Sequence, residues 1–386
     1  MRAVQIQKPG VVDVGDLPDP RPAPDQVLVS VEVCGVCGTD LHIADGHFAP
    51  TPYPIVPGHE FAGTVVEIGT GVSTGVTVGT RVAVDPSLFC GYCAACRRGR
   101  GNLCANWGAT GDTVDGAFAE LVSVPAANAY SLPDTMTFEQ GALVEPLSCA
   151  VHGVRRLGVE VGEKVLVVGA GTMGLLLIQL LARAGAHVVA VDRVSSKFGL
   201  AERMGAERTA TGIGELDGEL FDAVVDVTGV AAVIEEALDS VRRGGRFLVF
   251  GVAPADARVA LSPFRIYNDE ITVIGSMAVL HSFGTALDLI AKGTIDTDDL
   301  VSHRLPLNEY EQALEIVRAG AGTKVHVLRR RPDRGRRDRG EPADGGRDRP
   351  LHPLRGGEPG DQPQVRLAAG ERGTGEDHRV GRDRRW

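Results

Sequence analysis

Aromatic residues are scarce in this chain of 386 residues, at 5% of the total. The core must therefore be mostly aliphatic, and the 50 Gly residues predict many tight turns. The N-terminal residues 1–6, MRAVQI, lack the long apolar segment of a secretory signal peptide, so we expect a cytoplasmic protein. Hydrophobic residues at 43% and charged residues at 23% are typical of globular proteins and exclude wholesale disorder. The length predicts two or three domains.

Long uncharged segments would indicate a membrane protein, and one segment has to be considered. Residues 165–182 run for 18 positions without a charge, which is long enough to span a membrane. The segment contains Gly169, Gly171 and Gly174 and begins a series of alternating strands and helices. We therefore interpret it as a buried strand followed by a buried helix, with no membrane contact.

Lysine is absent from residues 329–386, which hold 16 Arg, 11 acidic residues, 11 Gly and 6 Pro. This composition buries too little apolar surface to offset the entropy of ordering, so it predicts a disordered tail. The tail is either a basic interaction segment or the product of a shifted reading frame, and we favour the second. Residues 1–328 hold 24 basic and 39 acidic residues, and this acidic body excludes nucleic acid as a partner.

The order of the apolar segments predicts two kinds of architecture in one chain. The first 150 residues are rich in short strands between Gly-rich turns, such as 27–33, 60–69 and 79–84. From residue 165 to 275, strands alternate with helices, which predicts a parallel sheet. The expected strands are 165–168, 188–191, 223–227, 247–250 and 271–274, and the expected helices are 172–183, 197–204 and 231–241. Helices at 283–291 and 307–319 and a closing strand at 324–328 follow.

Four cysteines form the strongest motif. Cys90, Cys93, Cys96 and Cys104 have the spacing of a tetrahedral zinc site closed by one loop. A ferredoxin-type cluster would place its fourth Cys after three residues and before a Pro, and paired disulfides would need an oxidising compartment. We predict a structural zinc ion, whose closed coordination leaves no position for a reaction.

A second group of residues has the chemistry of a catalytic zinc site. Its members are Cys37 in Cys-Gly-Thr-Asp-Leu-His, His59 and Glu60 in Gly-His-Glu, and Glu145 in Glu-Pro-Leu. Cys, His and carboxylate ligands that leave one position open are typical of catalytic zinc. A single Cys or His would more often be an ordinary core residue, so the prediction depends on their joint presence.

The segment around Gly169, Gly171 and Gly174 has the GxGxxG spacing of a dinucleotide-binding turn between a strand and a helix. Gly169 permits the tight turn, Gly171 lets the backbone approach a pyrophosphate, and Gly174 allows the helix to pack closely on the strand. Asp192, at the end of the next strand, would accept hydrogen bonds from the adenosine ribose and repel a 2′-phosphate. This favours NAD over NADP, although Arg193 follows directly.

In this order the three motifs resemble the zinc-dependent medium-chain alcohol dehydrogenase family over residues 1–328, and within it the sorbitol and threonine dehydrogenase branches. The resemblance implies an α/β fold, with a Rossmann domain of doubly wound parallel sheet and a β-rich GroES-like catalytic domain. The expected boundaries are 1–146 with 281–328 for the catalytic domain, 147–280 for the Rossmann domain and 329–386 for the tail. It also implies two zinc ions per chain and a homodimer or homotetramer.

The resemblance further implies roles for single residues. Cys37 and His59 hold the catalytic zinc, and either Glu60 or Glu145 completes the set. Thr39 and His42 match a proton relay, although Thr39 could instead stabilise a turn and His42 could be a surface residue. The expected cofactor-binding residues are Gly169, Gly171, Thr172, Met173, Gly174, Asp192, Arg193, Lys197 and Thr228.

The predicted reaction is hydride transfer from a secondary alcohol or small polyol to NAD, giving a ketone. Ile43, Ala278 and Val279 stand where the sorbitol branch carries polar or aromatic groups, which argues against a hexitol. The alternatives are a threonine or other amino-alcohol dehydrogenase, a non-catalytic NAD-binding relative and a zinc-free quinone reductase.

Overall fold

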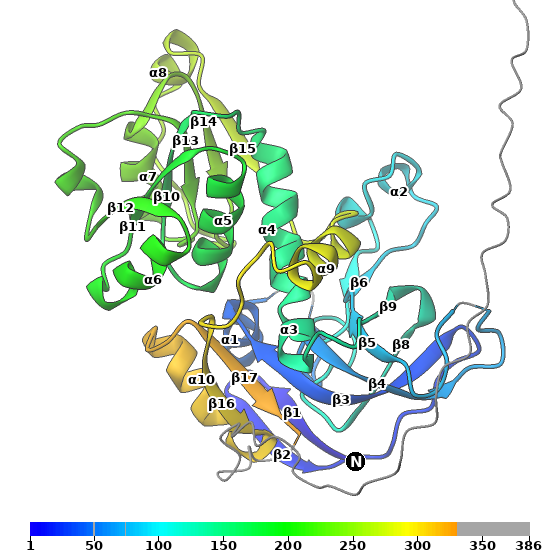
Figure 1. The fold of residues 1–386 in the computed structure, drawn as a ribbon. Helices are drawn as coiled ribbons and strands as arrows, with labels where there is room; N and C mark the ends of the chain where they lie inside the picture. The colour runs from blue at the N-terminus through cyan, green and yellow to red at the C-terminus, as the bar shows by residue number, and fades with distance from the viewer. Residues whose placement is uncertain (49–50, 74, 330–386) are drawn as a thin grey trace, which may run out of the picture. The chain divides into compact units, whose positions relative to one another are not determined.

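The computed structural model describes residues 1–48, 51–73 and 75–329, which belong to one compact unit built around two large sheets (Figure 1). The predicted disordered tail lies outside the described residues from position 330 onward. No helix in the described part of the chain is long and apolar enough to cross a membrane. The uncharged segment 165–182 forms part of a strand and most of a helix, as its glycine pattern predicts.

One sheet has six parallel strands in the order β12-β11-β10-β13-β14-β15. Its strands are β10 Lys164–Val168, β11 His187–Val191, β12 Ala206–Ala210, β13 Phe221–Asp226, β14 Val241–Val249 and β15 Thr272–Gly275. The helices that connect them are α5 Thr172–Arg183, α6 Phe198–Arg203, α7 Ala231–Asp239 and α8 Pro263–Asn268. The strand order reverses at β10, so the sheet is doubly wound and has a crevice at the carboxyl ends of its strands.

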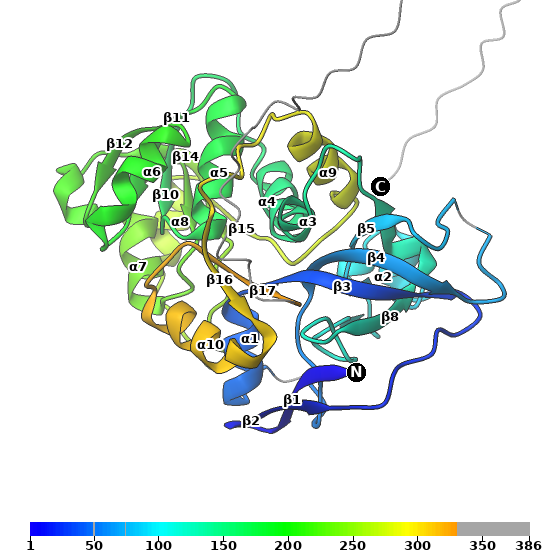
Figure 2. The same cartoon turned by 60° about the horizontal axis from the view of Figure 1, so that its bottom comes forward.

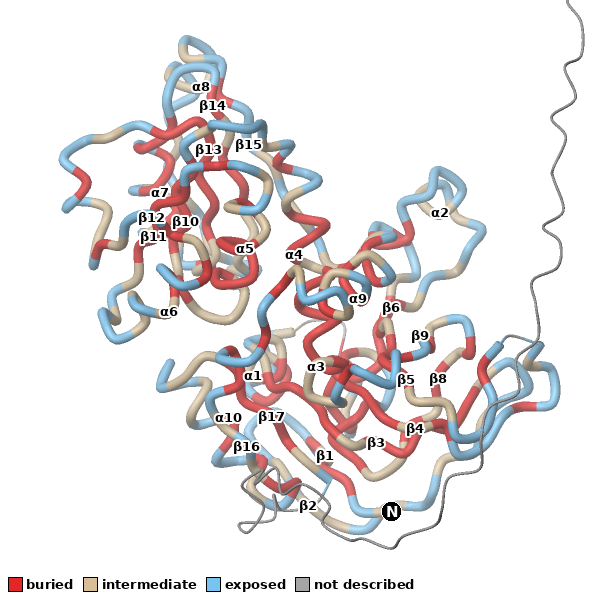
Figure 3. Tube along the Cα trace, viewed as in Figure 1, coloured by how far each residue is buried: buried red, intermediate tan, exposed pale blue. Residues whose placement is uncertain are grey.

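The central strand β10 shows why this sheet needs helices on both faces. Val165 and Val167 pack into one apolar cluster with residues of α5, whereas Leu166 and Val168 pack into another with residues of α7. Alternate side chains of a strand point to opposite faces, and here both faces are buried (Figure 3). Burial on both faces therefore explains why residues 165–168 of β10 are all apolar.

The other large sheet has the order β16-β17-β3-β4-β5-β9, with β8 also paired to β3. Its strands are β3 Gln26–Val36, β4 Glu60–Ile68, β5 Arg81–Val84, β8 Leu121–Pro125, β9 Ala129–Ser131, β16 Val301–Pro306 and β17 Lys324–Leu328. The pairing of β17 with β3 returns the end of the described chain to its beginning. Helices α1 Gly38–Asp45 and α10 Tyr310–Ala319 contact each other beside this sheet (Figure 2).

A long helix, α4 (Val144–Leu157), packs against α5 and α9 (Phe283–Ala291) and also contacts both large sheets. The remaining elements are β1 Arg2–Lys8, β2 Val11–Asp16, β6 Ser87–Leu88, β7 Gly108–Ala109, α2 Ala94–Arg97, α3 Phe138–Ala142, α4 Val144–Leu157 and α9 Phe283–Ala291. Short 3-10 helices lie at 101–103, 126–128, 195–197, 213–216 and 307–309. Because α4 spans from one sheet to the other, it brings residues of both to the same region of the molecule.

The predicted fold class is confirmed, and several elements have the predicted bounds. Helices α5 and α9 and strand β17 begin and end at the expected residues. The expected helix 231–241 ends at Asp239, and Val241 already belongs to β14. The division into domains at 146/147 and 280/281 stays a prediction.

Candidate active site and metal centres

Cys37 and His59 are brought together by the ends of two paired strands. Cys37 follows β3 and caps the N-terminus of α1, where its sulfur accepts a hydrogen bond from the backbone N–H of Thr39 at 3.3 Å. His59 directly precedes β4, after Gly58, whose φ of 104° lies in the region that favours glycine. The Sγ atom of Cys37 lies 3.1 Å from Nε2 of His59, so the two predicted ligands face each other.

Two aspartates lie beside the other nitrogen of the His59 ring. Nδ1 of His59 lies 3.0 Å from Oδ1 of Asp112 and 3.9 Å from Oδ1 of Asp40. Burial alone would lower the pKa of His59, but Cys37, Asp112 and Asp40 outweigh it and raise that pKa well above its ordinary value. A carboxylate behind a ligating imidazole fixes which nitrogen faces the metal, and here it directs Nε2 toward Cys37.

Asp40 was not among the residues predicted from the sequence. Its Oδ2 accepts a hydrogen bond from the backbone N–H of Cys37 at 2.9 Å, while its buried Oδ1 has no hydrogen-bond partner among the described residues. Burial raises the pKa of Asp40 to about 6. Its ligand atom lies with those of Cys37 and His59 within 4.8 Å of one another. Since Asp40 faces Nδ1 of His59 and not Nε2, its position suits orienting the ring better than binding the same ion.

Glu60, the first residue of β4, is paired with a buried lysine. Its Oε2 contacts Nζ of Lys324, and each of these side chains is only 3% exposed. Lys324 lies on β17 and also donates a hydrogen bond to the backbone oxygen of Val36 at 3.1 Å. Burial lowers the pKa of Lys324, but Glu60 and Cys37 reverse this and raise it above its ordinary value. Lys324 is thus a second site residue that the sequence motifs did not reveal.

Glu145, the second residue of α4, is buried close to the same centre. Its Oε1 accepts a hydrogen bond from the thiol of Cys149, one helical turn later, at 3.2 Å. Burial raises the pKa of Glu145 to about 7. The charge of His59 acts to lower this pKa, and the charge of Glu60 acts to raise it. Neither Glu60 nor Glu145 places an oxygen within the 4.8 Å group of Cys37, Asp40 and His59. Both carboxylates are near enough to influence the centre electrostatically.

The donor set at this centre fits zinc. It offers a sulfur, an imidazole nitrogen and buried carboxylates, which are the ligands that zinc prefers. Burial raises the pKa of the Cys37 thiol, and the buried Oδ1 of Asp40 has no hydrogen-bond partner among the described residues. A divalent cation would compensate these groups and displace the thiol proton.

Thr39 and His42, the predicted proton relay, both lie on α1. Thr39 is half-buried beside Cys37, and His42 is half-buried one turn further along the helix. Their positions are compatible with a relay, which stays a prediction. Ile43, predicted to line the substrate pocket, is fully buried in the core of the β-rich part of the chain. Val279 belongs to a different buried cluster.

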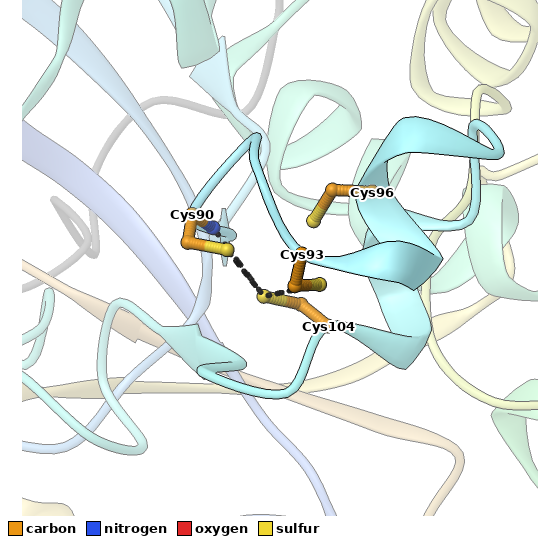
Figure 4. Close-up of side chains that lie close together, drawn as sticks. All are labelled: Cys90, Cys93, Cys96 and Cys104. Carbon is orange, nitrogen blue, oxygen red and sulfur yellow. Dashed lines mark hydrogen bonds between the residues drawn. The ribbon is translucent and has the colours of Figure 1, made fainter.

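The four cysteines of the predicted structural zinc site converge in one loop (Figure 4). Sulfur–sulfur distances are 3.5 Å between Cys90 and Cys104 and 3.9 Å between Cys93 and Cys104. Zinc–sulfur bonds of about 2.3 Å in a tetrahedron place sulfurs about 3.8 Å apart, so the loop has the dimensions of this site. All seven cysteines of the chain are free, so the structure contains no disulfide.

Backbone groups lower the pKa of Cys93 to about 6, through hydrogen bonds from Cys96 and Ala105. Burial and the neighbouring sulfur of Cys93 raise the pKa of Cys96 to about 12. These shifts favour loss of the proton from Cys93 before Cys96. A bound cation would favour the deprotonated form of all four.

The predicted dinucleotide turn joins β10 to α5. Gly169 has a φ of 108°, Gly171 caps α5, and a Cβ on Gly174 would overlap the backbone oxygen of Gly169. Asp192 follows β11 and accepts backbone hydrogen bonds from Ala170 at 2.8 Å and Val194 at 2.9 Å. These contacts place its carboxylate beside the turn, at the crevice of the sheet.

The other predicted cofactor residues surround this turn with different roles. Nζ of Lys197 lies 3.2 Å from Oδ2 of Asp192, and Thr228 lies close to Gly169 while its hydroxyl donates to Asp226 at 2.6 Å. The hydroxyl of Thr172 donates to the backbone oxygen of Thr323 at 2.8 Å, and Met173 packs against the apolar core. Arg193 is exposed.

Comparison with known proteins decides the family. Residues 23–134 match the alcohol dehydrogenase GroES-like domain, and residues 172–292 match the zinc-binding dehydrogenase domain. D-arabinitol dehydrogenase 1 of Uromyces fabae is 37% identical over 340 residues, covering 85% of this chain and 97% of its own. The chain belongs to the zinc-dependent medium-chain alcohol dehydrogenase family.

Two further relatives agree with this assignment. D-altritol 5-dehydrogenase of Agrobacterium fabrum is 36% identical, over 80% of this chain and 94% of its own. A zinc-binding dehydrogenase from Sinorhizobium meliloti, solved with NADP, has a TM-score of 0.80 and 37% identity, covering 85% of this chain and 98% of its own. This dehydrogenase is thus an oxidoreductase acting on alcohols, with zinc and a nicotinamide dinucleotide as cofactors.

Proposed function

We propose that this dehydrogenase oxidises a secondary hydroxyl group of a small polyol to a ketone, with NAD as the hydride acceptor. The observation that carries the proposal is the meeting of Cys37 and His59, 3.1 Å apart, in a buried centre that also holds the carboxyl groups of Asp40 and Asp112. The similarity to arabinitol and altritol dehydrogenases supports a polyol as the substrate.

Cys37 and His59 would hold the catalytic zinc, and we propose Glu145 as the third protein ligand. Glu60 is less available for this role because its carboxylate is paired with the buried Lys324. When bound, zinc supplies Lewis acidity that favours loss of a hydroxyl proton, and the nicotinamide accepts the hydride.

The protein's own groups orient these partners. Asp112 and Asp40 lie beside Nδ1 of His59, and Asp40 also accepts a hydrogen bond from the backbone N–H of Cys37 at the helix cap. Thr39, beside Cys37, would take the substrate proton and pass it toward His42 and solvent. The turn at Gly169–Gly174 would bind the pyrophosphate of the dinucleotide.

Asp192 supports NAD over NADP. Its carboxylate lies at the end of β11, where the second strand of such a fold meets the adenosine ribose. Lys197 neutralises part of that charge, so the preference for NAD over NADP should be measurable and not absolute.

Assembly into a homodimer or homotetramer and a cytoplasmic location stay predictions.

A substrate panel tests the proposal. Purified zinc-loaded enzyme is assayed with D-arabinitol, D-altritol, sorbitol and L-threonine, with NAD and NADP in parallel. We expect oxidation of at least one polyol with NAD and loss of that activity in Cys37→Ser. Oxidation of L-threonine in preference to every polyol would favour the amino-alcohol alternative.

A further inference from the structure

The segment that follows β15, residues 275–281, has an unusual backbone conformation. Ala278 has a φ of 48° and His281 has a φ of 50°. They are two of the four residues other than glycine that have a positive φ in the described part of the chain. Left-handed backbone is unfavourable for residues with a Cβ, so it persists only where surrounding contacts fix it. Residues fixed in this way are concentrated at sites that bind ligands.

This segment belongs to the half of the parallel sheet that the nicotinamide end of a dinucleotide would meet. The strand order β12-β11-β10-β13-β14-β15 is that of two mononucleotide-binding halves, which together bind a dinucleotide at the carboxyl ends of their strands. Asp192, which follows β11, lies in the half that takes the adenosine ribose. The other half consists of β13, β14 and β15. The segment after β15 is therefore on the nicotinamide side.

The loop of the predicted structural zinc site, residues 90–104, contacts this segment at two points. The amide nitrogen of Asn102 donates a hydrogen bond to the backbone oxygen of Met277 at 2.9 Å, and Asn102 is buried. Nε2 of His281 donates to the backbone oxygen of Gly99 at 2.9 Å. One contact lies directly before the first left-handed residue, and the other is made by the second. Both therefore act on the strained backbone itself.

The two contact residues of the loop lie close to its cysteines. The backbone N–H of Gly99 donates to the backbone oxygen of Cys96 at 2.9 Å. Asn102 lies in the 3-10 helix Gly101–Leu103, whose C-terminal cap is Cys104. A zinc ion bound by Cys96 and Cys104 would fix the backbone on both sides of these contacts.

Helix α4 contacts the two ends of the same segment. Nε of Arg156 donates to the backbone oxygen of Gly275 at 3.1 Å, and Nη1 of Arg155 donates to the backbone oxygen of His281 at 2.9 Å. These bonds do not involve the cysteine loop. A change at Asn102 alone therefore removes the loop's contact with the middle of the segment and leaves the ends attached.

We propose that Asn102 is a positioning residue, through which the zinc loop keeps the segment after β15 in the conformation that receives the nicotinamide ring. The inference rests on NAD as the proposed hydride acceptor and is independent of the alcohol that is oxidised. Without the hydrogen bond to Met277, the left-handed backbone at Ala278 would relax, and the nicotinamide end of the cofactor would bind less tightly. Binding of the adenosine end beside Asp192 would not change.

The test separates the two ends of the cofactor. NADH and ADP-ribose, which lacks the nicotinamide ring, are titrated calorimetrically into the zinc-loaded wild type and variants. We expect Asn102→Ala to bind NADH at least fivefold more weakly than the wild type, and to bind ADP-ribose within twofold of it. Asp192→Ala should weaken the binding of both compounds. Arg98→Ala is the matched control, because Arg98 is exposed on the same loop, and it should weaken neither.

A second substitution tests whether strain at Ala278 is the cause. Glycine adopts left-handed backbone about as readily as right-handed backbone, so Ala278→Gly removes the need for an external contact. NADH affinity of Asn102→Ala/Ala278→Gly should return to within twofold of that of Ala278→Gly alone. Loss of overall stability in Asn102→Ala would not be corrected in this way.

The outcomes distinguish this inference from the proposed function. Wild-type NADH affinity in Asn102→Ala would overturn the inference, and so would equal weakening of NADH and ADP-ribose or the absence of rescue by Ala278→Gly. Asn102→Ala should also retain the zinc content of the wild type. These titrations need no turnover, so their result is independent of the substrate panel. A wild type that binds neither compound would refute NAD as the acceptor and this inference with it.

Discussion

Two glycines of the dinucleotide turn should respond in opposite ways to the same substitution. A Cβ on Gly174 would overlap the backbone oxygen of Gly169, well inside the 3.0 Å limit that real Cβ atoms respect. A Cβ on Gly171 would meet no protein atom within 4 Å, and the φ of −76° at Gly171 suits any residue. Gly174 is thus needed for packing, and Gly171 only for the approach of a ligand.

The magnitudes follow from this geometry. Alanine is favoured over glycine in a helix by about 1 kcal/mol, but overpacking costs about 1–3 kcal/mol and here involves backbone that cannot rotate away. Gly174→Ala should therefore lower the free energy of unfolding, despite the better helix propensity. Gly171→Ala should leave it within about 1 kcal/mol of the wild type, yet weaken NAD binding about tenfold or more, which is about 1.4 kcal/mol.

Urea unfolding and calorimetric titration with NAD separate the two effects. We expect a lower urea midpoint for Gly174→Ala, and a normal midpoint with weak NAD binding for Gly171→Ala. Wild-type stability in Gly174→Ala, or wild-type affinity in Gly171→Ala, would refute the reasoning.

Three further predictions concern single charged or titratable groups. Asp192→Ala should raise KM for NAD and narrow the difference between NAD and NADP in steady-state kinetics; an unchanged cofactor ratio would contradict the role of its carboxylate. Lys324→Met leaves the buried carboxylate of Glu60 without its partner and should cost about 3–5 kcal/mol in urea unfolding, much of it restored by adding Glu60→Gln. Burial lowers the pKa of His326 well below 6.5. Below pH 6.5 the unfolded chain therefore binds a proton at His326, whereas the folded chain does not. The contribution of His326 to stability should therefore fall as the pH drops from 6.5, by up to about 1.4 kcal/mol per unit, and the stability of His326→Leu relative to the wild type should rise by this slope in urea unfolding at a series of pH values.

Local patterns were sufficient for the parts of the fold that repeat simple rules. The turn at Gly169–Gly174 and the helix α5 could be predicted because the strand, the glycines and the apolar helix are contiguous in sequence. Helix α4 was not predicted, although Glu145 was, and Pro146 in its first turn and its amphipathic pattern were usable signals. Its position depends on packing against α5 and α9, which no local pattern encodes.

The candidate catalytic centre shows the same limit. Cys37, His59, Glu60 and Glu145 were predicted from short motifs. The groups that orient or compensate them were not, because Asp40, Asp112 and Lys324 are single charged residues whose partners lie far away in sequence. Asp40 carried the one usable signal, since an acidic residue three positions after Cys37 completes a helix capping box.

One chain should carry both a catalytic and a structural zinc site, and metal content tests this most directly. The purified protein should contain about two zinc ions per chain. Cys37→Ser should retain about one ion and lose turnover while keeping its stability, whereas Cys93→Ser should lose the other ion and unfold at lower urea concentration. A Cys37→Ser protein that retains two zinc ions and wild-type turnover would contradict the account.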